Sequence, residues 1–321
     1  MNIQDKKILL IGGGTGNSQL LRTLKKFTEN ITSIVTVADD GGSSGFIRKD
    51  MGLLPPGDIR NCIIALADEE AVVRELMCHR FKTGSLKNQN FGNLLIAALN
   101  EMYGNFGDAV RNASEILAIK GRVLPVTLEN VALSAVLENG KRIKGESKIH
   151  KGVKKHKSPV LKMQMHPEHV KAYPYCIEAI KKADVIVYTP GSLYTSLIPN
   201  FLVSGIVDAL ERAKAKRFYV VNIMTEMGET DGYGVAQHIQ AIERHTDGRK
   251  IIDTVIYNTE DVTGTVLQEY RAENAELVST VIPENIHKEY ELCGLDLVEM
   301  TDGAVRHDGD VLWSKIFELS Q

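Results

Sequence analysis

The first apolar segment of the chain ends in a glycine-rich loop, and this pairing constrains the fold more than any other feature. Apolar residues 8–11 lead directly into the loop, and a helical pattern of leucines follows at Leu20, Leu21 and Leu24. A strand, a tight loop and a helix start in this order are typical of phosphate binding, because the first backbone N–H groups of a helix have no partner within it. The loop residues predicted to face a phosphate are Gly12, Gly13, Gly14, Thr15 and Gly16.

The spacing of the glycines distinguishes between the common nucleotide-binding loops. No lysine follows Gly16, so the loop lacks the Gly-Lys-Ser/Thr ending of a P-loop. Gly12 and Gly14 match a dinucleotide-binding fingerprint, but Asn17 takes the place of its third glycine. Asp39, at the end of the next apolar segment, stands where an NAD site has its ribose-binding acid. A tight βα turn without a ligand stays open as the alternative.

A second acidic and glycine-rich segment argues against NAD. A ribose needs one carboxylate, whereas Asp39 and Asp40 are adjacent and lead into another small-residue loop. Asp58 follows in a Pro-Pro-Gly-Asp segment, and carboxylates next to a phosphate are typical ligands of Mg²⁺. We therefore expect no NAD and predict Mg²⁺ on these three aspartates; the alternative is that they cap turns and helices. The loop residues predicted to face the ligand are Gly41, Gly42, Ser43 and Ser44.

A strand and a small-residue loop in the middle of the chain repeat this arrangement. Residues 184–188 are predicted to form a buried strand, and the following loop carries hydroxyl groups that can hydrogen-bond phosphate oxygens. We expect this loop at the same sheet edge as the first one, because open α/β sheets bind ligands at the carboxyl ends of their strands. The further residues predicted to face the ligand, from this loop and from other strand or helix ends, are Asn93, Gly191, Ser192, Thr195, Ser196, Asn222 and Thr225.

Two residues near the C-terminus are also candidates for ligand contacts. Tyr270 lies in a predicted helix, where its ring would stack on a base or a sugar. Arg306 is predicted to lie on a loop before the last helix, where its guanidinium would clamp a diphosphate. Spacing alone places neither side chain in the cleft, and a surface tyrosine and a surface arginine are the alternatives.

The sequence lacks the zinc-binding motif of hydrolytic metalloenzymes, because none of its nine histidines belongs to an H-E-x-x-H pair. If the protein is an enzyme, we expect a Mg²⁺-dependent transferase that acts on a phosphorylated group, and no catalytic residue is identified.

Composition limits the partners and the compartment. The net charge of −3 and the pI of about 6.3 predict no nucleic-acid partner. Four cysteines are scattered without a C-x-x-C pair, as expected for reduced thiols in a cytoplasmic protein. We find no signal peptide and no apolar run that could cross a bilayer, so we expect no direct membrane insertion. A homodimer is the default expectation.

The order of the predicted elements indicates an α/β fold. We expect a Rossmann-like, doubly wound, mostly parallel sheet in one domain at residues 1–321, with a β-rich, lysine-rich insertion at residues 121–165. The predicted strands are residues 7–11, 33–38, 131–137, 142–149, 160–165, 184–188, 218–224 and 252–257. The predicted helices are residues 17–27, 58–68, 70–80, 92–102, 107–118, 167–182, 234–245 and 309–319.

Six segments of the sequence carry a family resemblance that runs nearly end to end. These segments are residues 12–16, 35–45, 55–61, 91–95, 190–196 and 228–233. The chain resembles the gluconeogenesis factor family (YvcK-like), a branch of the 2-phospho-L-lactate transferase-like (CofD-like) proteins. Asn61, which ends the third segment, joins the predicted ligand-binding residues on this ground.

The resemblance implies two functions. The gluconeogenesis factor branch implies a cytoplasmic regulatory factor that binds a UDP-sugar such as UDP-N-acetylglucosamine and is required for cell shape and for growth under gluconeogenic conditions. Proteins of cell-wall synthesis would then be its partners. The transferase branch implies the alternative, a metal-dependent transfer of a phospholactyl or similar group. The double aspartate and residues 228–233 place the chain in the first branch.

Overall fold

The computed structural model describes residues 3–68, 71–301 and 303–321, and its centre is a seven-stranded sheet. All paired neighbours run parallel, in the order β10-β9-β8-β7-β1-β2-β3. This confirms the predicted α/β, Rossmann-like, doubly wound fold. The strands are β1 (Ile8–Gly12), β2 (Ile31–Val35), β3 (Arg122–Pro125), β7 (Val185–Tyr188), β8 (Lys216–Val220), β9 (Thr254–Asn258) and β10 (Glu291–Leu295).

The central strand β1 is buried on both of its faces. It pairs with β2 on one side and with β7 on the other, so that Leu10 lies opposite both Ser33 and Val187. The apolar side chains of residues 8–11 are at most 1% exposed. A parallel strand covered by helices on both faces has no polar face, which explains why this segment is continuously apolar rather than alternating.

The chain winds away from β1 in two directions. β2 and β3 extend the sheet on one side, and β7, β8, β9 and β10 extend it on the other. The direction in which the chain adds strands therefore reverses between β1 and β7. The connection after β1 and the connection after β7 run to opposite sides of the sheet at this point. Such a reversal leaves a crevice at the carboxyl ends of the strands, which is the usual ligand site of open α/β sheets.

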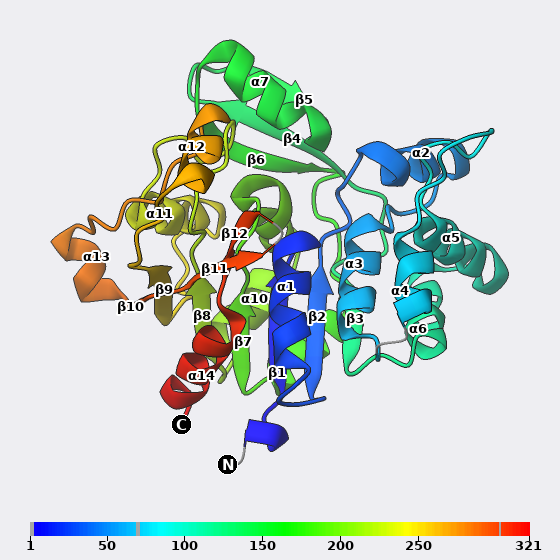
Figure 1. The fold of residues 1–321 in the computed structure, drawn as a ribbon, viewed down its shortest axis with the longest axis horizontal. Helices are drawn as coiled ribbons and strands as arrows, with labels where there is room; N and C mark the ends of the chain where they lie inside the picture. Colours follow the sequence, from blue (N-terminus) through cyan, green and yellow to red (C-terminus); the bar gives the residue numbers. More distant parts are fainter. Residues whose placement is uncertain (1–2, 69–70, 302) are drawn as a thin grey trace.

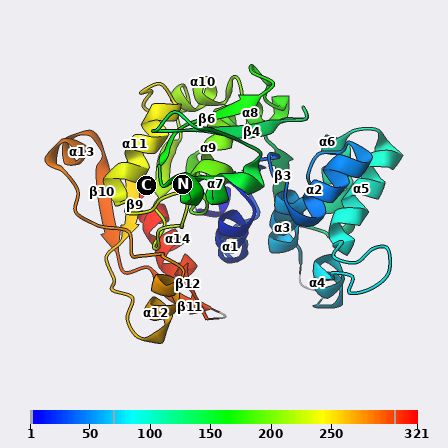
Figure 2. The same cartoon turned by 90° about the horizontal axis from the view of Figure 1, so that it is seen from above.

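Helices cover both faces of the sheet, as Figure 1 and Figure 2 show. On one face α14 packs on α1, and the buried Trp313 ring donates a hydrogen bond of 3.1 Å to the Leu20 carbonyl. On the other face α8 contacts α10. The helices are α1 (Thr15–Leu24), α2 (Gly42–Met51), α3 (Gly57–Leu66), α4 (Ala71–Cys78), α5 (Phe91–Tyr103), α6 (Phe106–Ile116), α8 (Pro174–Lys182), α9 (Ile198–Phe201), α10 (Ile206–Glu211), α11 (Val235–His245), α12 (Thr265–Ala272), α13 (Glu284–Glu289) and α14 (Gly309–Leu319), with short helical turns at η1 (Ile3–Asp5) and η3 (Leu193–Leu197).

A three-stranded antiparallel sheet lies above the carboxyl ends of the central strands in Figure 1. The predicted strand at residues 142–149 is wrong beyond Lys144, because a helix follows. Ile149 and Val153 are buried one helical turn apart while Lys151 between them is exposed, which is a helical pattern and not a strand pattern. The elements are β4 (Ala132–Leu137), β5 (Arg142–Lys144), η2 (Glu146–Lys148), α7 (Ile149–His156) and β6 (Val160–His166).

The insertion also begins later than residue 121. The segment Arg122–Pro125 is β3, which pairs in parallel with β2 at the edge of the central sheet. The antiparallel sheet therefore starts only at β4. A strand of four residues carries too little periodicity to be separated by sequence from the β-rich segment that follows it.

Three other predicted elements change their bounds or type. The helix expected at residues 167–182 begins only at Pro174, which fits a first helical turn because proline has no N–H group to leave unpaired. The helix expected at residues 70–80 is α4, and residue 70 lies outside the described residues. Arg306 lies on a strand and not on a loop, since β12 (Ala304–His307) pairs with β11 (Val298–Thr301) in a hairpin.

Candidate functional site

Two loops meet at the carboxyl edge of the sheet, where the strand order reverses. One follows β1 and leads into α1, and the other follows β7 and leads into η3. They touch through backbone: a Cβ atom on Gly16 would lie 1.8 Å from the Pro190 carbonyl oxygen. Any side chain at this position would therefore push the two loops apart, so Gly16 is required by the contact.

The N-terminus of α1 opens into this crevice. Its N-cap residue, Gly14, has no side chain, so the first N–H groups of α1 receive no side-chain cap at that position. Those groups carry partial positive charge from the aligned peptide dipoles. A phosphate at this point would accept their hydrogen bonds and would be stabilised by the helix dipole.

A cavity of about 390 Å³ lies at the junction of the two loops. It combines glycine loop backbone with hydroxyl, carboxylate and guanidinium groups from both halves of the chain. The predicted residues that line it are Gly13, Gly14, Thr15, Gly16, Asp58, Gly191, Ser192, Ser196, Asn222, Thr225, Tyr270 and Arg306. The structure thus brings twelve of the predicted ligand-facing residues into one cavity.

The C-terminal hairpin closes one side of the cavity. Tyr270 in α12 accepts a hydrogen bond of 3.1 Å through its hydroxyl from the Val305 N–H group of β12. His307 reaches across to the Val221 carbonyl at 3.0 Å, just after β8. These contacts fix β12, and with it Arg306, against the carboxyl edge of the sheet.

Sequence reasoning missed several lining residues. Gln19, Met224, Glu226 and His307 also line the cavity. Gln19 lies within the predicted α1 pattern and His307 directly follows Arg306, so neither stood out by residue type or spacing. Glu226 precedes the segment of residues 228–233, whose resemblance to the family was the one signal available for this loop.

Asn222 shapes the second loop rather than presenting a free amide. Its side-chain carbonyl accepts a hydrogen bond from the Gly191 N–H group, and its amide donates to the Gly191 carbonyl, both at 2.8 Å. Gly191 itself has φ of +134°, a conformation that L side chains rarely adopt. The two hydrogen bonds hold the loop in this form, so Asn222 positions the backbone that faces the cavity.

Other predicted residues lie behind the loops and hold the framework. Ser43 donates to Gln89 and Ser44 accepts from the Gly57 N–H group. Arg60 donates to the side-chain oxygens of both Asn93 and Asn61. The predicted residues outside the cavity lining are Gly12, Asp39, Asp40, Gly41, Gly42, Ser43, Ser44, Asn61, Asn93 and Thr195.

The three aspartates are not equivalent. Both Asp40 carboxylate oxygens accept backbone hydrogen bonds, from Glu146 at 3.0 Å and from Ser147 at 2.9 Å, so Asp40 anchors the insertion. Asp39 accepts a hydrogen bond of 2.8 Å from the Gly41 N–H group. Asp58 is the one of the three that lines the cavity.

Asp58 has an unusual proton affinity. Burial raises its pKa to about 7, and the neighbouring Asp39 charge adds to this effect, while Arg60 and the Gly14 backbone act in the opposite direction. A carboxyl group of this kind changes charge near neutral pH.

The three aspartates do not fit one shared magnesium site. Within residues 3–68, 71–301 and 303–321, their oxygens do not form a group of three ligand atoms within 4.8 Å of one another. Both oxygens of Asp40 accept hydrogen bonds from the insertion. Mg²⁺ on Asp39, Asp40 or Asp58 stays a prediction.

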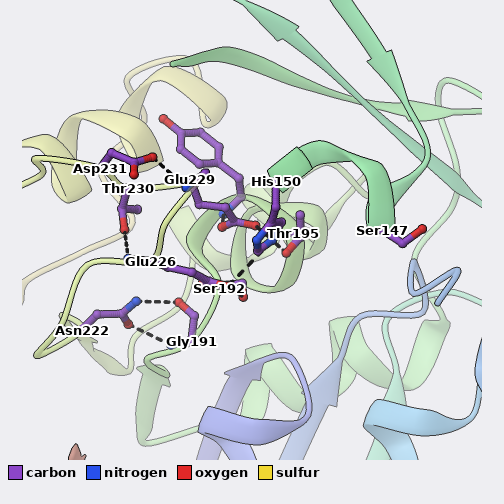
Figure 3. A network of polar contacts seen from close by, with 12 residues as sticks. Ser147, His150, Gly191, Ser192, Thr195, Asn222, Glu226, Glu229, Thr230 and Asp231 are labelled. Carbon is purple, nitrogen blue, oxygen red and sulfur yellow. Dashed lines mark hydrogen bonds and ion pairs between the residues drawn. The ribbon is translucent and has the colours of Figure 1, made fainter. Parts of the chain in front are cut away.

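A second acidic group lies at the edge of the cavity, which Glu226 lines, and Figure 3 shows this group beside His150. Glu226 and Glu229 lie in the loop after β8, and His150 reaches them from α7. Thr195 does not line the cavity and donates a hydrogen bond of 2.6 Å to Glu229. This network joins the insertion, the loop after β7 and the loop after β8.

Comparison with known proteins identifies the family of the chain. The model of the family "2-phospho-L-lactate transferase CofD" matches residues 8–293. The class of protein that the fold and cleft define is therefore the CofD-like α/β class. The Gluconeogenesis factor of Halalkalibacterium halodurans is 41% identical over 99% of this chain and 96% of that protein, and the Gluconeogenesis factor of Bacillus subtilis is 40% identical over 98% of each. The chain belongs to the gluconeogenesis factor family within the CofD-like proteins.

A solved structure supports the same assignment. The crystal structure of a member of the UPF0052 family from Bacillus halodurans superposes with a TM-score of 0.92 at 39% identity, covering 97% of this chain and 99% of the other. No helix in the described part of this chain is both long and apolar enough to cross a membrane.

Proposed function

We propose that the protein is a regulatory factor that binds a UDP-sugar in the cleft between β1 and β7. The diphosphate would lie against the first turn of α1 and the Gly191–Ser192 backbone, where N–H and hydroxyl groups can donate hydrogen bonds. The Arg306 guanidinium would pair with a phosphate, and the Tyr270 ring would stack on the base or the sugar.

One observation carries this proposal: Tyr270 and Arg306, from the C-terminal end of the chain, line the same cavity as the N-terminal glycine loop. A phosphate alone would need only the loop and the helix start. An aromatic ring and a guanidinium next to that loop suit a larger ligand that has both a charged and a stackable part. An adjoining cavity of about 570 Å³ shares Thr225, Glu226 and Tyr270 with the first and gives room for that part.

The regulatory role rests on the family. Relatives such as those from Halalkalibacterium halodurans and Bacillus subtilis carry the name Gluconeogenesis factor. We propose that ligand binding in the cleft couples the level of a sugar nucleotide to growth under gluconeogenic conditions and to cell shape, through protein partners in cell-wall synthesis. A cytoplasmic homodimer is the form in which we expect it to act.

Titration calorimetry tests the proposal. We expect UDP-N-acetylglucosamine or UDP-glucose to bind with a stoichiometry near one. UMP lacks the second phosphate and the sugar that is attached to that phosphate, so we expect it to bind at least tenfold more weakly. Arg306→Ala serves as the variant that removes the phosphate contact. Absence of heat and of a thermal shift with either UDP-sugar at millimolar concentration would exclude this function. NAD is the control that we expect not to bind.

Asp58 favours a second candidate function, a metal-dependent transfer of a phosphorylated group. It is a buried carboxyl group at the phosphate loop, and its raised pKa suits a group that exchanges a proton near neutral pH. Incubation with Mg²⁺ and activated phospho-donors would then give product by mass spectrometry. Full turnover in Asp58→Asn would contradict a role of Asp58 in that reaction.

A further inference from the structure

We propose that His150, Glu226 and Glu229 form a binding site for one divalent transition-metal ion. The three side chains come together at the rim of the cleft, where α7 of the insertion meets the loop after β8 (Figure 3). This site is separate from the aspartates of the glycine loops. It depends on no nucleotide and therefore does not rest on the function proposed above.

The ligand atoms already lie at the spacing that one ion requires. The Nε2 atom of His150 is 3.0 Å from Oε1 of Glu229 and 3.7 Å from Oε1 of Glu226. Ligand atoms of the three residues all lie within 4.8 Å of one another. Two atoms that bind the same zinc ion at about 2.1 Å are separated by roughly 3 to 3.5 Å, so small side-chain movements would complete the site.

Hydrogen bonds from the loop after β7 orient both carboxylates. Glu229 accepts from the Thr195 hydroxyl at 2.6 Å and from the Tyr194 N–H group at 2.9 Å. Glu226 accepts from the Ser192 hydroxyl at 2.9 Å. Metal-binding carboxylates are typically held by such outer contacts, which fix their direction before the ion arrives.

Backbone packing also holds His150 close to the two glutamates. Gly228 packs directly on the His150 backbone, and a Cβ atom on Gly228 would lie 2.7 Å from the His150 carbonyl oxygen. The loop is braced from within, because the Gly228 N–H group donates to Asp231 and the Glu226 N–H group donates to Thr230. The loop after β8 supplies two of the three ligands and α7 supplies the third. Close backbone packing between these two elements brings the ligands to one point.

Charge is the independent observation that points to a cation. The Glu229 side chain is 0% exposed and Glu226 is only 33% exposed, so both carboxylates are largely removed from water. The two carboxylates face a single imidazole, that of His150, at 3.0 Å and 3.7 Å. Lys154 lines the adjoining cavity with Glu226. A divalent ion would neutralise this surplus of negative charge.

The donor set selects the class of ion. One imidazole nitrogen with two carboxylate oxygens suits Zn²⁺, Mn²⁺ and their neighbours, whereas Mg²⁺ prefers oxygen ligands alone. Three protein ligands leave a coordination position open. Because Glu226 lines the cleft beside Ser192, an ion held there would lie next to a bound phosphorylated ligand.

Metal titration of the full chain tests the site. Protein stripped with a chelator is titrated with Zn²⁺ alone by calorimetry, and with Co²⁺ by absorption spectroscopy. We expect one ion per chain, and at least tenfold weaker binding in His150→Gln and in Glu226→Gln. His156→Gln is the matched control, because His156 stands at the end of the same helix α7 and is not part of the cluster. We expect wild-type affinity in this control.

The pattern of binding across the variants distinguishes a metal site from a salt bridge. No binding of either ion, or equal binding in His150→Gln, Glu226→Gln and His156→Gln, would overturn the proposal. If circular dichroism shows that His150→Gln or Glu226→Gln does not fold, the metal affinity of the other variant tests the proposal.

Discussion

Gly14 and Asp58 pack so closely that a Cβ atom on Gly14 would lie 2.3 Å from Oδ1 of Asp58. The same atom would lie 2.8 Å from the Asp58 Cα, so a new side-chain rotamer of Asp58 cannot relieve the clash. The phosphate loop and the start of α3 are therefore one packed unit. Any side chain at Gly14 must move backbone in α1 or α3.

Gly14→Ala is expected to lower the free energy of unfolding by about 1–3 kcal/mol, the usual range for overpacking. It should also abolish UDP-sugar binding, because the displaced loop no longer presents its N–H groups. Urea denaturation and calorimetry measure the two effects. Gly41→Ala is the control, since its Cβ would have its nearest neighbour at 3.3 Å and φ at Gly41 is −96°. Equal stability of the two variants would contradict the close packing.

Asp58 predicts a pH-dependent stability. Its folded pKa of about 7 exceeds the ordinary value of 3.8, so the folded state binds a proton that the unfolded state has lost. The stability contributed by Asp58 should therefore fall as the pH rises from about 4 to about 7 and then stay constant. Asp58→Asn removes this dependence, and the wild type should lose up to about 4 kcal/mol relative to it across this window. Denaturation at pH 5, 6, 7 and 8 measures the difference; a constant difference would refute the shift.

His150 predicts a pH dependence of the same sign in a higher pH window. Its folded pKa of about 9 exceeds the ordinary value of 6.5, so its ion pair with Glu229 stabilises the fold fully below pH 6.5. This stabilisation should be lost as the pH rises from 6.5 to 9. In chelator-containing buffer, His150→Gln should therefore be less stable than the wild type at pH 6 and similar to it at pH 9.5. Hydrogen exchange should show the loss in α7, and His156→Gln should show neither effect.

Arg306 should contribute mainly to ligand binding. It lines the cleft, and its hydrogen bond within the chain goes to the adjacent Val305 carbonyl. Arg306→Ala is expected to weaken UDP-sugar binding at least tenfold, because hydrogen bonds to charged groups contribute about 1.5–3 kcal/mol. Arg111→Ala is the control for loss of an arginine. The ion pairs of Arg111 with Asp108 and Glu115 lie at the exposed surface of α6. Equal affinities in calorimetry would place the phosphates elsewhere.

Tyr270 combines two roles that substitution can separate. Its hydroxyl accepts from the Val305 N–H group, and its ring lines the cleft. Tyr270→Phe keeps the ring, so binding should fall only a few-fold, whereas Tyr270→Ala should remove the stacking surface and weaken binding at least tenfold. The affinities of the two variants for UMP and for the UDP-sugar are then compared. A loss of affinity for both ligands places the ring on the nucleoside, whereas a loss for the UDP-sugar alone places it on the sugar. Equal losses in both variants would assign Tyr270 a purely structural role.

Local pattern was sufficient for most of the central fold. The apolar segments of β1, β7 and β9 and the helical patterns of α1, α5 and α14 are each specified by their own residues. The strands that the sequence did not reveal lie at sheet edges: β3 and β10 end the central sheet and β12 belongs to a two-stranded hairpin, and none of the three is buried along its whole length. In such elements the pairing partner, rather than the local sequence, decides the structure.

The sequence by itself determined the two glycine loops, because strand, loop and helix start are local and adjacent. The direction of Asp40 toward the insertion, the closure of the cleft by Tyr270 and Arg306, and the meeting of His150 with Glu226 and Glu229 were decided only by tertiary structure. Each of these contacts joins segments that are far apart in the chain. Their side chains meet because the sheet order and the packing of the insertion bring them together, and neither is encoded in the spacing of residues along the chain.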